Sequence, residues 1–332
     1  MPTTNRRAVL CAALSTPFLL RATGAAAQAY PTRPIRLVVP FPPGGSTDTT
    51  ARLTAEYLGQ RLGQSIVVEN KGGAGGIIGT DSVVRGPADG YSLVFGTVSS
   101  TAINHPLFGD RMPYQADDLA GVGLVLSAPN LVLVRSDSPF RTLQDLVAHA
   151  KAHPGALNFG TTGPGSSVQM AGALLRLSAG IDVEAISYRG SAQVLQELLG
   201  GRVDFSVDSI PSAIALIRGG QLRVLAVTDG QRASVLPDVP TTTEAGLPQV
   251  QSTAWFGLLA PASTPRPIID RLGRELAAVL EDPTLRQRLE ELGGGPLPLP
   301  GGRTTPEAFD AFIRSEIAKW TDVVQKTGVS TS

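Results

Sequence analysis

The sequence contains two copies of one arrangement, in which a short apolar segment is followed by a glycine-rich loop and then by a helix-forming segment. Alternation of strands and helices is typical of a parallel sheet covered by helices. Ligands of open α/β sheets bind beyond the carboxyl ends of the strands, where such loops lie. We therefore predict an α/β protein with two lobes, each of which brings one glycine-rich loop to a shared site. The predicted strand, loop and helix are 35–40, 41–48 and 49–62 in the first copy, and 157–160, 161–167 and 168–179 in the second.

The first loop offers hydrogen-bond donors to an anion. Gly44 and Gly45 allow the backbone to turn and to approach a ligand closely. The helix that follows starts with unpaired N–H groups and a partial positive charge, and Ser46 and Thr47 add hydroxyl groups. A purely structural alternative is that Ser46 caps the helix and Asp48 lies in its first turn. This loop alone does not decide between the two interpretations.

The second loop, 161–167 (TTGPGSS), has the same features in the other half of the chain. Two such loops together predict that an anion or a polar ligand binds between the lobes. Neither loop is a nucleotide P-loop, because no lysine follows the glycines in the pattern G-x-x-x-x-G-K-[ST]. The dinucleotide pattern G-x-G-x-x-G is also absent from the sequence.

Two charged residues are further candidates for the site. The segment 203–208 alternates apolar and polar residues, which predicts a half-exposed strand. Asp208 lies at its carboxyl end, where it either lines the pocket or caps a helix that starts near Pro211. Arg189 follows another predicted strand and would place a cation near the cleft, although arginines in loops are more often solvated.

Groups for catalysis, metal binding or nucleic-acid binding are sparse. His149 and His153 have a spacing that suits a metal, but the sequence H-A-K-A-H lacks the glutamate of a zinc protease and favours an exposed pair near a helix end. No G-x-S-x-G nucleophile motif occurs. The chain has 28 basic and 28 acidic residues, which argues against a nucleic-acid-binding protein. We expect no catalytic residues, no metal, no cofactor and no nucleic-acid partner.

Residues 1–29 have the composition of a secretory signal peptide. They contain three arginines and no acid, and the apolar run 8–20 is shorter than the roughly 20 residues of a membrane span. Alanine-rich cleavage patterns follow at 25–29, and the pair Arg6 and Arg7 leaves a twin-arginine export route open. An N-terminal membrane anchor is the alternative. The single cysteine, Cys11, lies in this segment, so the mature chain has no thiol chemistry. We expect a protein of the bacterial periplasm.

Six stretches carry a family resemblance. They are YPTRPIRLVVPFPPGGSTDTTAR (30–52), VVENKGGAGGIIGTDSVVRGPADGYSLVFGT (67–97), LNFGTTGPGSSVQMAGALL (157–175), SYRGSAQVLQELLGGRVDFSVDS (187–209), LRVLAVTDGQRASVLPDVPTTTEAGL (222–247) and AWFGLLAPASTP (254–265). In this order they resemble the tripartite tricarboxylate transporter receptor family, the Bug or TctC-type extracytoplasmic solute-binding proteins. The resemblance extends from about residue 30 to the C-terminus.

The resemblance implies a periplasmic binding-protein fold of the type II-like, two-lobe kind, with the ligand cleft between the lobes. Two crossover strands are expected near 127–133 and 253–259. The first lobe would be discontinuous, and the second lobe would be inserted into it. The expected limits are 30–128 and 254–332 for lobe 1 and 129–253 for lobe 2, after a signal peptide at 1–29.

The resemblance also implies which residues bind the ligand, because the family holds a carboxylate largely by backbone and hydroxyl groups of two loops. Gln169 stands where the family commonly has a histidine, and glutamine keeps the hydrogen bonding but cannot become cationic. By motif, the expected ligand-binding residues are Phe41, Gly44, Gly45, Ser46, Thr47 and Asp48 in the first loop, Thr161, Thr162, Gly163, Gly165, Ser166 and Ser167 in the second, and Thr97, Ser99, Gln169 and Asp208 elsewhere in the cleft.

The function implied is capture of a small organic carboxylate between two lobes and its delivery to a membrane transporter. The family implies a large and a small integral-membrane subunit as partners, and we expect the receptor to be a monomer. The alternative is a periplasmic sensor that docks on a signalling protein. An enzyme on the same scaffold is disfavoured, because the sequence shows no activated nucleophile and no metal cluster.

Overall fold

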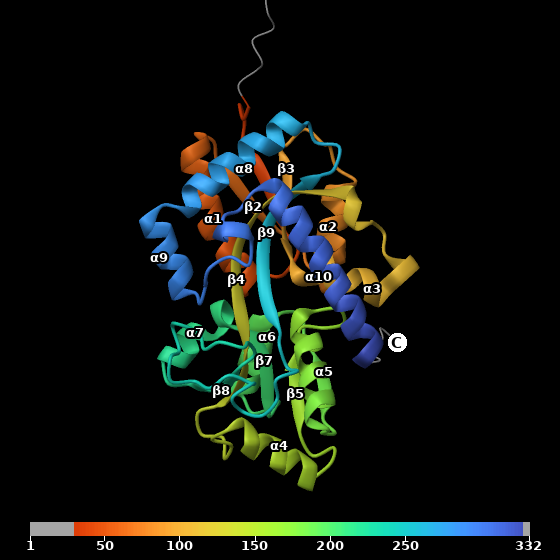
Figure 1. Cartoon of the computed structure of the whole chain (residues 1–332), viewed down its shortest axis with the longest axis vertical. Helices are drawn as coiled ribbons and strands as arrows, with labels where there is room; N and C mark the ends of the chain where they lie inside the picture. The colour runs from red at the N-terminus through yellow and green to blue at the C-terminus, as the bar shows by residue number, and fades with distance from the viewer. Residues whose placement is uncertain (1–29, 328–332) are drawn as a thin grey trace, which may run out of the picture.

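Two groups of strands lie one above the other along the long axis of the molecule (Figure 1). The computed structural model describes residues 30–327. The strands of this part of the chain are β1 (Ile35–Val39), β2 (Ile66–Asn70), β3 (Ser92–Thr97), β4 (Leu119–Arg135), β5 (Asn158–Thr161), β6 (Glu184–Ser187), β7 (Phe205–Ser209), β8 (Leu222–Val227) and β9 (Thr253–Pro261).

Helices cover both groups of strands. They are α1 (Ser46–Leu62), α2 (Ile77–Val84), α3 (Asn104–Phe108), α4 (Leu143–Ala152), α5 (Ser167–Ala179), α6 (Ser191–Leu199), α7 (Ile210–Arg218), α8 (Arg266–Leu280), α9 (Pro283–Glu291) and α10 (Pro306–Thr327). A π-helical turn, η2 (Ser99–Ile103), leads into α3. Within residues 30–327 no helix combines the length and the apolar character that a bilayer span requires.

The two long strands β4 and β9 connect the lobes. In lobe 1, β2, β1 and β3 are parallel, and β9 and the first part of β4 continue the sheet in antiparallel fashion. In lobe 2, the second part of β4 pairs with β7 and β8, and β5 lies between β7 and β6. The pairing of β4 changes from β9 to β7 between Pro129 and Asn130. Crossover strands near 127–133 and 253–259 are thus where we expected them, while the limits 30–128, 129–253 and 254–332 stay a prediction.

Lobe 1 has an apolar core on each face of its sheet. In Figure 1, α1 and α9 lie to the left of β4 and β9, and α8 runs across the top of the molecule toward α9. The apolar residues of these helices form one buried cluster with β1 and β3. The helices α2, α3 and α10 lie to the right and form a second cluster around Trp255 and Trp320. Met170 and Leu174 of α5 belong to this second cluster, so apolar packing continues from lobe 1 into lobe 2.

Four of the helices α1 to α10 start with a side-chain cap, namely α4, α5, α9 and α10. Thr142 and Asp145 form a reciprocal capping box at α4, and Asp282 caps α9. The expected cap at α1 is wrong: the helix starts at Ser46, three residues earlier than predicted, and Gly45 is the N-cap without any side-chain cap. Gly45 adopts the extended conformation that an N-cap needs, and Ser46 is already helical.

The prediction of a half-exposed strand at 203–208 is also wrong. All residues of β7, including Ser206 and Asp208, are buried. The strand lies between β4 and β5 in the sheet, and helices α5, α6 and α7 pack against it. A polar residue in this strand therefore faces a helix start or a neighbouring carbonyl instead of water.

Candidate functional site

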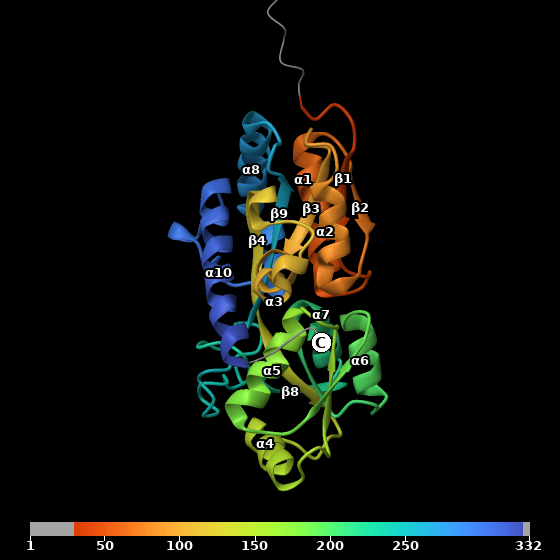
Figure 2. The ribbon, with the colours of Figure 1, turned by 90° about the vertical axis from the view of Figure 1, so that its right-hand side faces the viewer.

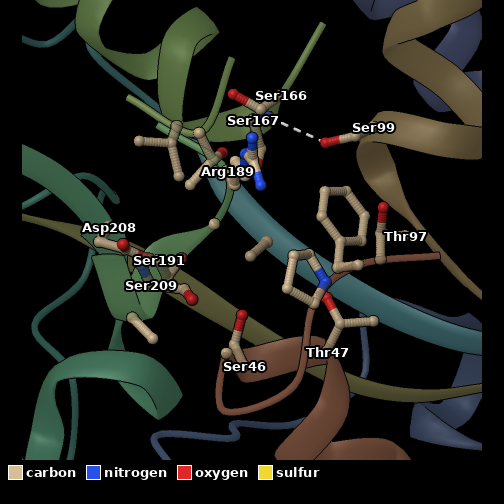
Figure 3. A pocket seen from close by; sticks show the side chains of 18 of the residues that line it. Ser46, Thr47, Thr97, Ser99, Ser166, Ser167, Arg189, Ser191, Asp208 and Ser209 are labelled. Carbon is tan, nitrogen blue, oxygen red and sulfur yellow. Dashed lines mark hydrogen bonds between the residues drawn. The ribbon is translucent and has the colours of Figure 1, made fainter. Parts of the chain in front are cut away.

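A cavity of about 320 Å³ lies between the lobes. Loops and helix starts surround it: the β1–α1 loop and η2 come from lobe 1, and the starts of α5, α6 and α7 come from lobe 2 (Figure 3). Its lining residues are Phe41, Pro42, Pro43, Gly45, Ser46, Thr47, Thr97, Val98, Ser99, Ala254 and Phe256 in lobe 1 or at the crossover, and Thr162, Ser166, Ser167, Val168, Arg189, Gly190, Ser191, Ala192, Gln193, Gln196, Asp208 and Ser209 in lobe 2.

The β1–α1 loop presents the start of α1 to the cavity. Ser46 and Thr47 occupy the first turn, and no side chain caps this end of the helix. The N–H groups of a helix start have no partner within the helix, so here they are available to a ligand. The hydroxyl groups of Ser46 and Thr47 have no hydrogen-bond partner among the described residues.

Asp48 does not line the cavity but fixes this loop. Its Oδ2 accepts from the backbone N–H of Gly44 at 3.0 Å, and it also binds Arg52 and Asn70. Gly44 has a φ of +85°, which favours glycine at this turn. Burial acts to raise the pKa of Asp48, but the hydrogen bonds from Arg52, Gly44 and Asn70 outweigh it and lower that pKa below its ordinary value. Asp48 therefore stays charged as part of the loop's framework.

The β5–α5 loop is braced in a similar way. Ser166 caps α5 by accepting from the N–H of Gln169 and donates its hydroxyl hydrogen to the carbonyl of Gly163. Gln169 turns back, and its Oε1 accepts from the N–H of Gly165 at 2.9 Å. Gln169 thus holds the loop and does not line the cavity.

One hydrogen bond crosses the cleft beside the cavity. The backbone N–H of Ser167 donates to Oγ of Ser99 at 2.9 Å, as the dashed line in Figure 3 shows. Nearby, Gly165 lies against Asn104, at a φ of +76°. The two predicted loop systems therefore meet around one site.

A third helix start, that of α6, completes the site and was not among the predicted binding residues. Gly190 is its N-cap, and no side chain caps it. Arg189, the only cation among the lining residues, projects toward the cavity from the preceding loop (Figure 3). The sequence signal was a third strand–glycine–helix arrangement at 184–199, in which Gly190 precedes Ser191.

Asp208 is the only acid among the lining residues, and it is 1% exposed. Its Oδ1 accepts from Oγ of Ser191 at 3.0 Å, from the N–H of Ser209 at 2.8 Å and from Oγ of Ser212 at 2.7 Å. Desolvation by burial outweighs these donors and raises the pKa of Asp208 above its ordinary value. Asp208 lines the cavity, and the N-cap of α7 is Ser209 and not Asp208, although Asp208 accepts from the N–H of that residue.

Ten of the sixteen predicted residues line the cavity, namely Phe41, Gly45, Ser46, Thr47, Thr97, Ser99, Thr162, Ser166, Ser167 and Asp208. The other six lie in or beside the loops without lining it, namely Gly44, Asp48, Thr161, Gly163, Gly165 and Gln169. The assignment of all sixteen residues as ligand contacts stays a prediction. Within residues 30–327, no group of three or more His, Cys, Asp or Glu side chains is arranged to hold a metal ion.

The arrangement suits a small anion with an apolar skeleton. Helix starts and one guanidinium supply positive potential, while Phe41, Val98 and Phe256 supply apolar surface. A cavity of this size falls within the range of small-molecule sites, about 300–1,000 Å³.

Comparison with known proteins places the chain in a family. Residues 50–329 match the family described as "Tripartite tricarboxylate transporter family receptor". BugT of Bordetella pertussis (strain Tohama I) is 36% identical over 303 residues, which cover 91% of each chain. The structure of MatC from Rhodopseudomonas palustris with bound malate is 34% identical, with a TM-score of 0.83, and the match covers 89% of this chain and 100% of that one. The structure of R. palustris Rpa4515 with adipate is 34% identical, with a TM-score of 0.84 and coverage of 91% and 99%.

These structures confirm the predicted two-lobe fold. The family match spans most of the described residues and includes both lobes. The chain therefore belongs to the tripartite tricarboxylate transporter receptor family, a family of periplasmic solute-binding proteins.

Proposed function

We propose that the protein is a receptor that captures a small organic carboxylate between its lobes. The observation that carries this proposal is that α1 and α6, from opposite lobes, both start at the cavity without side-chain caps, with Arg189 beside them. Such groups bind carboxylates through charge-assisted hydrogen bonds. Malate and adipate in the structures of similar proteins support the same ligand class.

The energetics are adequate for tight binding. A micromolar dissociation constant corresponds to about −8 kcal/mol. Hydrogen bonds to a charged group contribute about 1.5–3 kcal/mol each, so several of them exceed this value before the ordering cost is subtracted. Closure of the lobes strengthens these bonds further, because it removes water from around the carboxylate.

A thermal-shift assay of the chain from Tyr30 onward tests the proposal. The panel contains aliphatic dicarboxylates, tricarboxylates, aromatic acids and acidic amino acids. One class should raise the melting temperature in a saturable way, because the ligand binds only the folded state. Arg189→Gln should weaken this response about tenfold or more, whereas Arg176→Gln, an exposed arginine of α5, should leave it unchanged. Folded, ligand-free protein that responds to no carboxylate would contradict the proposal.

The receptor would work as a periplasmic monomer after removal of residues 1–29, which lie outside the described residues. It would deliver its ligand, chemically unchanged, to a membrane transporter with a large and a small subunit, as the family description suggests. Three measurements test this: the N-terminal sequence of the periplasmic protein, ligand uptake by a deletion strain, and recovery of intact ligand by NMR. Normal uptake in the deletion strain would contradict the transport role.

A further inference from the structure

The hydroxyl group of Ser191 can accept a hydrogen bond from a ligand in the cavity but has no hydrogen left to donate to it. A serine hydroxyl has one hydrogen, and Ser191 donates it to Oδ1 of Asp208, 3.0 Å away. Asp208 is buried and Ser191 is half-buried, so the bond lies at the edge of the cavity with its acceptor inside the protein. Because Ser191 lines the cavity at the first position of α6, lone pairs of its Oγ remain for a ligand.

This orientation does not depend on the charge of Asp208. The hydroxyl group of Ser191 and the N–H of Ser209 already donate to Oδ1, and the hydroxyl group of Ser212, 2.7 Å away, can donate either to Oδ1 or to the carbonyl of Ser209. Oδ2 is buried and has no hydrogen-bond partner among the described residues. A proton taken up by Asp208 therefore binds Oδ2, and Oδ1 accepts from Ser191 in either state.

Ser191 also offers a donor close to this acceptor. Its backbone N–H belongs to the first turn of α6, which no side chain caps. On the opposite wall, the hydroxyl groups of Ser46 and Thr47 have no intramolecular partner among residues 30–327 and can donate (Figure 3). The acceptor of Ser191 therefore lies next to a backbone donor of the same residue, and hydroxyl groups of the other lobe face it.

We propose that the site selects 2-hydroxycarboxylates, with the carboxylate accepting from the N–H of Ser191 and the 2-hydroxyl group donating to its Oγ. In such acids a carboxylate acceptor and a hydroxyl donor lie on adjacent carbons, which matches a donor and an acceptor on one residue. An acid without the hydroxyl displaces water from the Oγ of Ser191 and gives it no donor in return, which lowers affinity. The inference rests on the proposed function, since it assumes a carboxylate ligand.

Calorimetric titration with matched acids tests the inference. The probes are 2-hydroxybutyrate, 3-hydroxybutyrate and butyrate, together with malate and succinate. We expect the 2-hydroxy acid of each set to bind about tenfold more tightly than its partners. Ser191→Ala should reduce this preference to less than about twofold, because only the acceptor is lost. Asp208→Asn, which keeps an acceptor oxygen for Ser191, should retain the preference.

Ser315→Ala is the matched control, because Ser315 is exposed on α10 and its hydroxyl binds only the carbonyl of Phe312. Circular dichroism checks that each variant is folded. If butyrate and succinate bind the unaltered protein as tightly as the 2-hydroxy acids, the inference is wrong while the carboxylate receptor stands. Tighter binding of 2-aminobutyrate would also overturn it, because the donor would then be an ammonium group. If no acid binds, the proposed function itself fails.

Discussion

At the scale of single residues, Gly165 makes the contact between the β5–α5 loop and lobe 1. Its φ is +76°, and a Cβ there would lie 2.2 Å from Oδ1 of Asn104 and 3.0 Å from a ring atom of Phe108. We expect Gly165→Ala to weaken ligand binding at least tenfold, because the loop must move away from α3, and to cost about 1–3 kcal/mol of stability. Gly180→Ala is the control: Gly180 has a φ of +61° but open space around it. Equal losses of affinity in the two variants would show that strain alone, not contact with α3, is responsible.

Asp208 should make stability depend on pH in a defined direction. Its raised pKa means that the folded protein binds this proton more tightly than the unfolded chain does. Stability should therefore fall as pH rises from the ordinary aspartate value through the raised one, by up to about 1.4 kcal/mol per pH unit. Asp208→Asn removes this titration. Urea unfolding of both proteins from about pH 4 to about pH 8 measures the free energy of unfolding of each. The free energy of the variant should increase relative to that of the unaltered protein as pH rises, and a decrease would contradict a raised pKa for Asp208.

The residues that the sequence did not identify share a physical reason. Ser191, Ala192 and Gln193 reach the cavity because α6 starts there, and the order of the strands in the sheet brings this start beside the other two. Arg189 was a candidate from the sequence, and it lines the cavity from the loop before α6. Conversely, Asp48 and Gln169 lie within the expected motifs, yet each accepts a hydrogen bond from a glycine N–H of its own loop. Ser46, Thr47, Ser166 and Ser167 were predictable, because first-turn residues lie where the strand–loop–helix order directs them.

At the scale of secondary-structure elements, one buried carboxylate connects β9 to α10. Glu316 accepts from Nε1 of Trp255 at 2.9 Å and from Nε1 of Trp320 at 3.3 Å. We expect Glu316→Ala to cost about 2–4 kcal/mol, because it leaves two buried indole N–H groups without an acceptor, and Glu316→Gln to cost less. Lys319→Ala removes an ion pair with Glu316 and a cation–π contact with Trp320, but it leaves both indole N–H groups bonded, so it should cost about 1 kcal/mol or less. Urea unfolding measures all three, and a similar cost for all would contradict this role.

Element types were predictable where the local pattern agreed with its surroundings. Thr142 and Asp145 at α4 have the residue types and the spacing that a capping box requires, and Gly63 ends α1 in the left-handed conformation that favours glycine. The prediction for β7 was wrong because its alternating pattern is typical of a strand with one solvent-exposed face, whereas helices and neighbouring strands bury both faces of β7. Its polar residues are satisfied internally: Ser206 donates to the carbonyl of Gly160, and Asp208 accepts at the start of α7.

At the scale of the whole molecule, the lobes meet through apolar packing as well as through the ligand cavity. Both views place the end of α10 beside α5 (Figures 1 and 2). Met170 and Leu174 of α5 share a buried cluster with Trp320 of α10 and Leu107 of α3. The hydrogen bond from Ser167 to Ser99 lies at the same junction. These contacts between the lobes are made by protein atoms alone, so they favour this arrangement of the lobes in addition to any contacts that a ligand makes.

Removal of part of this packing should shift the protein toward an open state. We expect Leu174→Ser to enlarge the ligand-free protein in small-angle X-ray scattering, and saturating ligand should reverse the change. Only the closed fraction binds tightly, so the apparent affinity should fall in proportion to that fraction. Relative to a protein that is fully closed, the fall is about tenfold if the open state of the variant is about 1.4 kcal/mol more stable than its closed state. Leu177→Ser is the control on the same helix, since Leu177 is 53% exposed and Leu174 is 8% exposed. A Leu174→Ser protein that melts earlier but keeps its size and affinity would show that this side chain stabilises lobe 2 alone and has no part in closure.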